Sequence, residues 1–171
     1  PKYYPELSSK KIITMDWMDG EHLSEFVAHN ENRAKGDSIG QALWDFYMFQ
    51  MHQLRQVHAD PHPGNFLIDK EGNLIAIDFG CIKQVPEDFY IPYFELARPE
   101  IMDNQKLFLE KLYELEILRK DDTDEEVAYF SELFNRLLRL FTKPYQTDAF
   151  DFSDEAFFGE MAQLSEEYSK D

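Results

Sequence analysis

Cysteine, basic residues and long apolar runs are all scarce in this chain of 171 residues. Cys81 is the single cysteine, so no disulfide can form within the chain, and a reducing compartment is favoured. No apolar run approaches the roughly 18 residues that span a bilayer, and no signal-peptide pattern opens the sequence. These absences predict a soluble cytoplasmic protein and leave open a peripheral contact with a membrane.

The charge balance is strongly acidic, with 17 Lys and Arg against 34 Asp and Glu and a formal net charge of −17. We expect no nucleic-acid partner, because no basic patch follows the chain. The acidity is uneven: residues 1–86 carry 8 basic and 12 acidic side chains, and residues 87–171 carry 9 and 22. We expect any chemistry to lie in the less acidic half.

The remaining composition is sufficient for one folded domain. The sequence is 43% hydrophobic and contains 15 Phe and 9 Tyr, which can build a core at this length. The chain begins at Pro1 and not at a methionine, so we expect it to be a piece of a longer protein.

A hairpin is predicted at the start of the chain. The β-branched run at 11–15 can pair with residues 2–6 across a turn at 7–9. The link at 16–20, DWMDG, is polar and ends in glycine. We therefore expect a strand pair followed by a break in regular structure.

Helical sequence follows this link. Leu23, Phe26 and Val27 predict one or two helical turns before a loop at 30–37. A second helix is predicted from Ser38 to about Val57, because apolar residues recur there three or four apart.

The next stretch, residues 58–80, reads HADPHPGNFLIDKEGNLIAIDFG. Its prolines and glycine interrupt the helix, and the apolar runs 66–69 and 74–78 predict two strands joined by a turn at 70–73. The stretch is therefore expected to form a loop, a strand, a turn, a strand and a second loop.

Three polar side chains of this stretch are expected to converge. A tight loop places Asp60 and Asn65 at the mouth of the strand pair, and Asp78 ends the second strand. Carboxylate and amide oxygens, completed by phosphate and water, suit Mg²⁺. Phosphoryl transfer uses the same set, with one carboxylate on the metal and another near the attacking hydroxyl. The pattern thus predicts a magnesium site for phosphoryl transfer.

The second half of the chain is predicted to be helical. Apolar stripes predict helices at 105–118, 125–141 and 154–168. Thr123 or Asp124 is expected to cap the second of these helices and Ser153 the third. With the short strands of the first half, the expected fold class is α+β and mostly helical.

The spacing of these motifs resembles the protein-kinase-like superfamily. His58-Ala59-Asp60, then Asn65 five residues after Asp60, then a strand pair and Asp78-Phe79-Gly80 match its pattern. The form HADPHPGN followed by DFG is most similar to the UbiB/ADCK (aarF-domain-containing) atypical kinases, a family linked to ubiquinone biosynthesis. Aminoglycoside and choline phosphotransferases share a similar loop, but Phe79-Gly80 favours the UbiB/ADCK family over them.

The resemblance implies a role for each matching residue. Asp60 would be the catalytic base, and Asn65 would assist catalysis and hold Mg²⁺ together with Asp78. Phe79 would pack against the core to orient Asp78, with Gly80 allowing the turn. ATP would be the phosphoryl donor.

The resemblance also implies how the nucleotide is bound. Asp16 and Met18 would offer a backbone carbonyl and N–H to adenine, with Met15 as the gatekeeper side chain. Leu67 would form the floor of the adenine pocket, and Asp78 would reach the nucleotide through the metal. His58 would be a structural residue beneath the loop.

The implied fold is a protein-kinase-like C-lobe. Residues 1–20 would be a remnant of the N-lobe strands and hinge, and residues 21–171 the C-lobe, with catalytic and metal loops at 58–80 and a helical half at 87–171. The chain contains no Gly-rich loop, no Val-Ala-x-Lys strand and no UbiB-type Lys-x-Gly-Gln motif. We therefore expect the N-lobe to be a missing partner and the chain alone to be inactive.

Alternatives remain at this stage. The full protein is expected to be an ATP-dependent kinase acting on a small-molecule or lipid-like acceptor, or an ATPase, rather than a kinase of proteins. A silent kinase-like module, whose residues 101–168 bind a protein or lipid, is the second hypothesis. His58, Asp60 and His62 share one face of an extended segment and could hold a transition metal, but the kinase pattern already accounts for these residues.

Overall fold

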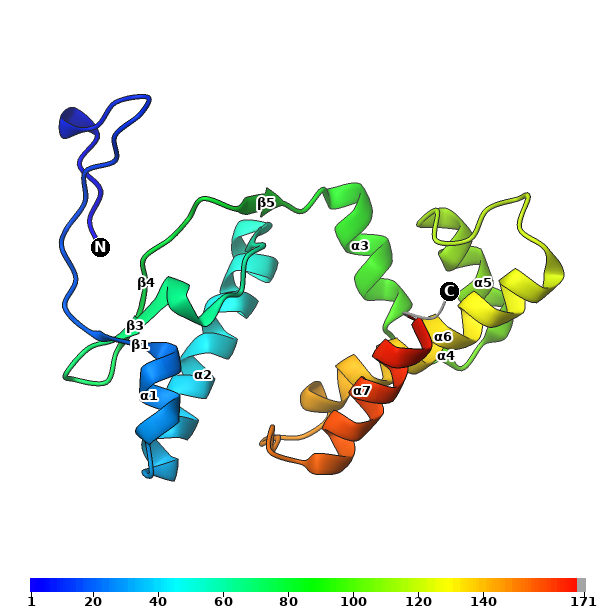
Figure 1. Ribbon diagram of the computed structural model, residues 1–171. Helices are drawn as coiled ribbons and strands as arrows, with labels where there is room; N and C mark the ends of the chain where they lie inside the picture. The colour runs from blue at the N-terminus through cyan, green and yellow to red at the C-terminus, as the bar shows by residue number, and fades with distance from the viewer. Residues whose placement is uncertain (169–171) are drawn as a thin grey trace. The chain divides into compact units, whose positions relative to one another are not determined.

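A computed structural model describes residues 1–168, which divide into two compact units (Figure 1). The first unit is Pro1–Pro86 and the second begins at Glu87. All the named strands lie in the first unit, and the second is helical. The mostly helical α+β class is therefore confirmed. No helix in the described range is both long and apolar enough to cross a membrane.

The N-terminal segment is a loose antiparallel pair and not a regular hairpin. Tyr3 and Met15 form an isolated bridge. A 3₁₀ helix, η1 (Pro5–Leu7), interrupts the pairing, because Pro5 has no amide hydrogen to give to a ladder. The chain reverses at 10–11, so the turn predicted at 7–9 was wrong by a few residues.

The helices of the first unit begin where polar side chains cap them. α1 (Leu23–His29) lies where the apolar spacing predicted it. α2 (Arg33–Phe49) begins inside the predicted loop, because Asn32 Oδ1 accepts a hydrogen bond from Lys35 N at 3.1 Å. The polar run that suggested a loop is the cap and first turn of α2.

A π turn, η2 (Gln50–Leu54), follows α2 directly. Arg55 then adopts φ 54°, a left-handed conformation that ends the helix before the predicted Val57. The Arg55 guanidinium donates to the carbonyl oxygens of Met51 and His52, which satisfies groups that a helix end leaves unpaired. The chain therefore leaves α2 already directed into a strand.

Two small antiparallel sheets complete the first unit. The order of the three-stranded sheet is β1-β3-β4, and β2 pairs with β5 in the other. The β3–β4 hairpin confirms the strand pair predicted there, whereas the sequence pattern indicated neither β1, β2 nor β5, each of which is too short to show a period. The strands are β1 (Glu21–His22), β2 (Gln56–His58), β3 (Phe66–Ile68), β4 (Leu74–Ala76) and β5 (Ile82–Gln84).

The side chains on the two faces of β3 have different neighbours. Phe66 and Ile68 are each 1% exposed and pack with residues of α1 and α2. Leu67 points to the opposite face, where it is paired with Ile75 of β4. Gly20 lies against this strand so closely that an added Cβ would be 2.8 Å from Ile68 O.

Over residues 87–168 the second unit consists of five helices and a short 3₁₀ turn. α5 ends before the predicted residue 118, because Glu116 takes a left-handed φ of 56°. Thr123 caps α6, as predicted, but Asp154 Oδ1 and not Ser153 receives the amide of Ala156 at the start of α7. The elements are α3 (Glu87–Leu96), α4 (Pro99–Met102), α5 (Gln105–Glu114), α6 (Asp124–Thr142), η4 (Lys143–Tyr145) and α7 (Glu155–Tyr168).

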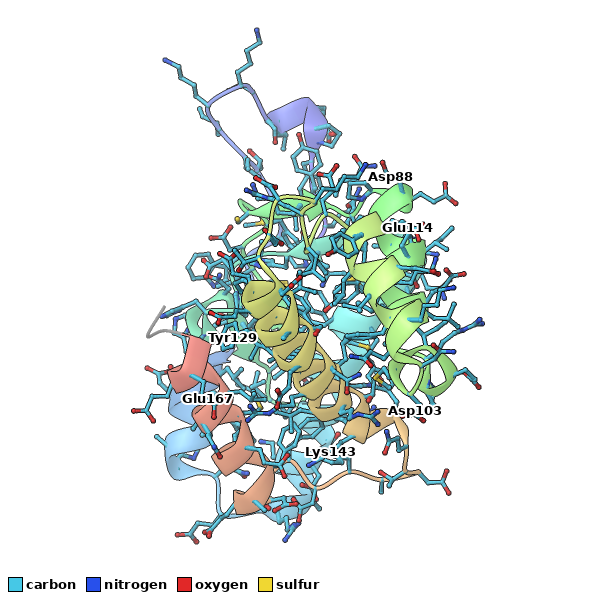
Figure 2. The ribbon with its side chains drawn as sticks, turned by 90° about the vertical axis from the view of Figure 1, so that its right-hand side faces the viewer. Asp88, Asp103, Glu114, Tyr129, Lys143 and Glu167 are labelled. Carbon is cyan, nitrogen blue, oxygen red and sulfur yellow. The ribbon has the colours of Figure 1, made fainter. Side chains whose placement is uncertain are left out.

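Apolar side chains hold these helices together. One cluster, from α3 to α6, contains Leu96, Met102, Phe108, Leu112, Leu118 and Leu138. A second joins α6 to α7, which lie beside each other in Figure 2. Glu167 of α7 forms an ion pair with Arg136 of α6, and Lys143 of η4 forms one with Glu160 of α7. The last three residues of the predicted helical half, 169–171, lie outside the described range.

Candidate active site

His58 is the buried centre of the predicted site. Its side chain is 3% exposed at the end of β2. Nε2 lies 2.6 Å from Asp78 O, and Nδ1 lies 3.3 Å from Asp60 N. A backbone N–H can only donate and a carbonyl can only accept, so these bonds require the proton on Nε2 and a lone pair on Nδ1. One imidazole ring therefore joins the loop that carries Asp60 to the loop that carries Asp78.

Asp60 and Asn65 meet directly. Asn65 Nδ2 donates to Asp60 Oδ2 and to Asp60 O, each at 3.1 Å. The 3₁₀ turn η3 (Pro63–Asn65) sets this approach, and His62 Nδ1 caps it by accepting from Gly64 N at 3.0 Å. Within residues 1–168 the amide oxygen of Asn65 has no hydrogen-bond partner, so it remains an available acceptor.

Asp78 directly follows a residue whose backbone is hydrogen-bonded to Asn65. Ile77 N donates to Asn65 O at 3.0 Å, which extends the β3–β4 pairing to the residue before Asp78. Asp78 Oδ1 accepts from Gly80 N at 2.7 Å, whereas Oδ2 has no hydrogen-bond partner in the described part of the chain. A Cβ on Gly80 would lie 3.1 Å from Asp78 Oδ1, so glycine suits this tight turn.

The position of Phe79 differs from the expectation that it packs against the core. Its side chain is 52% exposed, and its ring contacts the edge of His58 at a centroid distance of 6.3 Å. The hydrogen bond from Gly80 back to Asp78 turns the chain so sharply that the residue between them points outward. Phe79 therefore touches the site through His58 and not through the apolar cluster.

The available oxygens fit a hard cation. Asp78 Oδ2 and the amide oxygen of Asn65 are carboxylate and carbonyl donors of the kind that Mg²⁺ prefers, and Mg²⁺ commonly takes its remaining ligands from phosphates and water. The expected site with two protein ligands is consistent with these donors.

The transition-metal alternative fails. Within residues 1–168 no three His, Cys, Asp or Glu side chains are grouped to hold a metal ion. His58 uses both ring nitrogens inside the protein, and His62 Nδ1 is occupied by Gly64 N. His58, Asp60 and His62 share a short segment without forming a ligand set.

The predicted adenine-binding segment is ordered around Asp16. Its carboxylate accepts from the Tyr4 hydroxyl at 2.7 Å and from Lys2 N at 3.0 Å, and these bonds lower the pKa of Asp16. Met15 is exposed and Met18 half-buried. Leu67 is buried on the face of β3 that points away from Phe66 and Ile68. In the described chain no hydrogen bond joins residues 1–20 to residues 58–80, so the structure does not bring the two sets together in that way.

Two residues of α2 and η2 were not predicted to take part. Gln50 is 7% exposed, and its Oε1 accepts from His58 N at 3.0 Å. Burial, and then the negative charge of Asp60, raise the pKa of Tyr47, whose buried hydroxyl has no hydrogen-bond partner among the described residues. In the sequence, Tyr47 looks like one more member of the apolar stripe of this helix, so nothing distinguishes it. Gln50 could have been noticed, because it is a polar residue beside that stripe.

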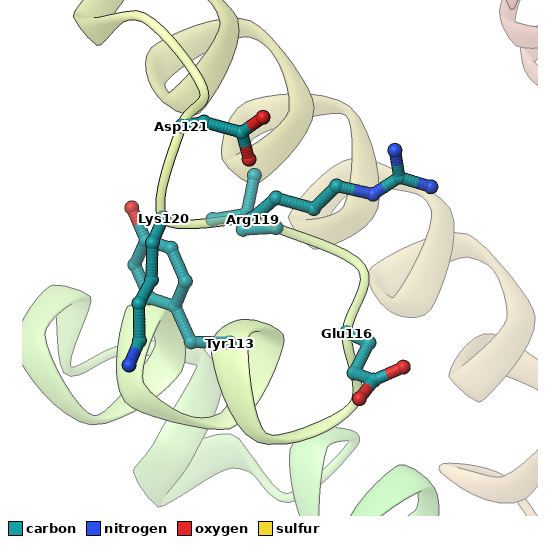
Figure 3. A pocket seen from close by; sticks show the side chains of 6 residues that line it. Tyr113, Glu116, Arg119, Lys120 and Asp121 are labelled. Atoms are coloured by element: carbon teal, nitrogen blue, oxygen red, sulfur yellow. The ribbon is translucent and has the colours of Figure 1, made fainter.

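A recess of about 740 Å³ lies in the second unit, in the connection between α5 and α6. Figure 3 shows that the side chains of Arg119, Lys120 and Glu116 extend in different directions from its rim. It contains none of the predicted site residues, and its charges do not converge on a common point.

Comparison with known proteins agrees with the motif. The ABC1 atypical kinase-like domain matches residues 1–112, which extends past Pro86 into α5. An ABC1 family protein of Schizosaccharomyces pombe is 41% identical over 70 residues, covering 41% of this chain and 13% of that protein. Protein ACTIVITY OF BC1 COMPLEX KINASE 3, chloroplastic, of Arabidopsis thaliana is 32% identical over 88 residues, covering 52% and 12%.

A mammalian relative covers more of the chain. AarF domain-containing protein kinase 1 of Mus musculus is 27% identical over 120 residues, covering 66% of this chain and 23% of that protein. The chain therefore spans less than a quarter of the length of each of these relatives.

Proposed function

This chain belongs to the ABC1 atypical kinase-like (ADCK) family, and we propose that it carries the metal-binding and acceptor-facing half of an ATP-dependent phosphoryl-transfer site. The acceptor is a small molecule, a lipid-like compound or water. The similarity to UbiB/ADCK kinases favours a link to the biosynthesis of ubiquinone or another isoprenoid quinone. An acceptor of that kind would bring the protein into peripheral contact with a membrane.

One observation carries this proposal. The Asn65 amide donates both of its hydrogens to Asp60, which leaves its oxygen available for a cation. One of these bonds goes to the Asp60 carboxylate and the other to the Asp60 backbone carbonyl, so Asn65 ties the side chain of Asp60 to its own loop. A single residue thus couples the proposed metal ligand to the proposed base.

Each carboxylate has a separate proposed task. Asp78 and Asn65 would hold Mg²⁺, which supplies charge neutralisation to the phosphates when it is bound. Asp60 would accept the proton of the attacking hydroxyl or water, a task that suits an exposed carboxylate oriented by Asn65. His58 holds the backbones of both loops and takes no part in proton transfer.

The nucleotide is proposed to enter between this half and a further segment of the longer protein. The Asp16 carbonyl and the Met18 amide make no backbone hydrogen bonds within the described chain, so both are available to adenine. Met15 and Leu67 would line the same pocket. A lysine outside this chain would hold the phosphates, because none of its own lysines lies in the family's Lys-x-Gly-Gln motif.

The mutants Asp78→Asn and Asp60→Asn separate these roles in the longer protein. We expect Asp78→Asn to abolish magnesium-dependent ADP binding in calorimetry, because it removes the metal carboxylate. Asp60→Asn should retain that affinity and lower phosphate release by orders of magnitude. Asp45→Asn, on the exposed surface of α2, removes the same charge outside the site and should leave both quantities unchanged.

Several results would contradict this proposal. Wild-type ADP affinity in Asp78→Asn would rule out the metal role of Asp78. Undiminished turnover in Asp60→Asn would rule out the base. The 171-residue chain alone should release no phosphate, since positioning and charge stabilisation carry this reaction, and robust turnover by it would refute the need for a second segment. Normal ADP binding without turnover in the longer wild-type protein would favour the silent module.

A further inference from the structure

Gln50 is the polar side chain that lies deepest beside the candidate site without belonging to it. It is 7% exposed, and His58 at 3% is the other buried polar residue in the described chain. A buried amide is costly unless its donors and acceptors are paired. The two residues are hydrogen-bonded to each other, so the cost of burying each depends on the other.

The Gln50 amide is paired at both ends. Oε1 accepts from His58 N at 3.0 Å, and Nε2 donates to Phe46 O at 3.3 Å. Phe46 lies four residues earlier in α2, so Gln50 is braced against its own helix while it holds the end of β2. An apolar side chain of similar size could supply neither bond.

The π turn η2 begins at Gln50 itself. π turns of this kind often occur at functional sites, because one extra residue per turn redirects the chain that follows. Here the turn is closed by the left-handed Arg55, and β2 starts immediately after it. The irregular helix end therefore brings the His58 backbone back onto the Gln50 side chain.

The His58 ring is in turn hydrogen-bonded to the Asp60 loop and to the Asp78 loop. Its ring donates to Asp78 O and accepts from Asp60 N, so the position of its backbone sets the separation of the two loops. The path from Gln50 to either loop contains only hydrogen bonds between buried or partly buried atoms. Gln50 itself contacts neither carboxylate.

We infer that Gln50 is a positioning residue, which fixes the backbone of His58 and thereby the register of the Asp60 loop with the Asp78 loop. The effect of Gln50 on catalysis rests on the proposed function. Its effect on the position of the His58 ring does not. The residues proposed to contact the metal or the acceptor are still Asp60, Asn65 and Asp78.

Nitrogen-15 NMR of the histidine side chains in the 171-residue chain tests the structural part. In the wild type, His58 should show a single tautomer with its proton on Nε2. Gln50→Met, which keeps the side-chain length and removes both bonds, should give a mixture of tautomers at His58. Gln53→Met, in the exposed part of the same π turn, is the matched control and should leave the His58 signals unchanged.

Activity of the longer protein tests the catalytic part. We expect Gln50→Met to lower kcat for phosphate release at least tenfold, with a smaller change in KM, while Gln53→Met retains both. Gln50→Glu keeps the acceptor for His58 N and should restore the single Nε2 tautomer and part of kcat. A merely structural role would lower thermal stability without these changes at His58.

The failures of the two proposals differ. A wild-type His58 with its proton on Nδ1, or His58 signals that are unchanged in Gln50→Met, would overturn the positioning role. The wild-type spectrum decides this even if the Gln50 variants fail to fold. An inactive longer protein with the expected His58 spectrum would overturn the proposed function alone.

Discussion

The candidate site and the second unit are stabilised in different ways. In the first unit, the residues nearest the candidate site are joined by hydrogen bonds among His58, Asp60, Asn65 and Gln50, and the strands contain two or three residues each. In the second unit, six fully or nearly buried apolar side chains form one cluster, and the helices carry long apolar stripes.

The interactions that position the site residues are therefore different from those that contribute most to the stability of the helical unit. Apolar contacts are non-directional and tolerate small shifts, whereas hydrogen bonds fix donor and acceptor within tenths of an ångström. The candidate site relies on bonds of the second kind, whereas the rest of its unit also packs around buried apolar residues of α1, α2 and β3. The helical unit has the greater share of acidic charge and none of the predicted site residues.

The largest effect is expected from a substitution in the core of the second unit, which tests whether the two units unfold separately. Leu112 is 0% exposed, and Leu112→Ala should destabilise the second unit by about 2–5 kcal/mol through the lost contacts and the cavity that remains. Hydrogen exchange should report the loss in α5 and α6 and leave β3 and β4 protected.

Leu107→Ala is the control for this experiment, because Leu107 lies in the same helix and is 38% exposed. It should change the exchange rates little. Equal loss of protection in both units after Leu112→Ala would show that they unfold as one.

The next largest effect is expected from replacing two glycines of the first unit, one closely packed and one exposed. Gly20→Ala should destabilise it by about 1–3 kcal/mol, because the new Cβ would meet Ile68 O at 2.8 Å. Gly40→Ala, in exposed α2 with nothing within 4 Å, should stabilise it by about 1 kcal/mol. Urea denaturation of both variants measures the difference, and effects of the same sign would contradict the predicted contact at Gly20.

A smaller effect is expected where α5 ends. Glu116 holds φ 56° and is exposed, so Glu116→Gly should stabilise the second unit by about 1 kcal/mol by removing the strain of a left-handed residue. Glu110→Gly, inside the same helix, should instead cost about 1 kcal/mol. Thermal unfolding of both variants measures the contrast, and destabilisation by Glu116→Gly would refute the strain.

The smallest effect concerns an exposed ion pair in the first unit. The hydrogen bond from His29 to Glu21, and then the charge of Glu21, raise the pKa of His29. A raised folded pKa stabilises the fold below the ordinary histidine value, and this contribution is lost as pH rises through the folded value. An NMR titration should place His29 above its ordinary range and return it there in Glu21→Gln. An unchanged midpoint in Glu21→Gln would exclude the pair as the cause.

The sequence predicted most of the helices and the motif hairpin because their signals are long or specific, whereas α3 and α4 were covered only by the general expectation of a helical half at 87–171. The stripe at 125–141 identified α6 and its Thr123 cap, and the apolar runs at 66–69 and 74–78 identified β3 and β4. The pairing of β2 with β5 left no such signal. Gln56 and Gln84 are opposite each other there, with no apolar alternation to reveal the contact.

For the candidate site, motif spacing indicated which residues lie near one another, and the Asp60–Asn65 contact agrees with it. The assigned roles remain predictions. The spacing could not indicate that Phe79 points outward, because this depends on a hydrogen bond between its two neighbours. Nor could it identify Gln50, whose position depends on a π turn that has no periodic signature.

The pairing of β2 with β5 also has a kinetic consequence. His58 is paired with Ile82, so one ladder closes the whole stretch that contains the candidate site into a loop. The entropic cost of closing a loop grows with its length, and prior formation of the β3–β4 hairpin shortens the free chain that must be closed. We therefore expect that hairpin to form first during folding and the Asp60 and Asp78 loops to meet only when the ladder closes. Fraying of β5 would release both loops in a single step.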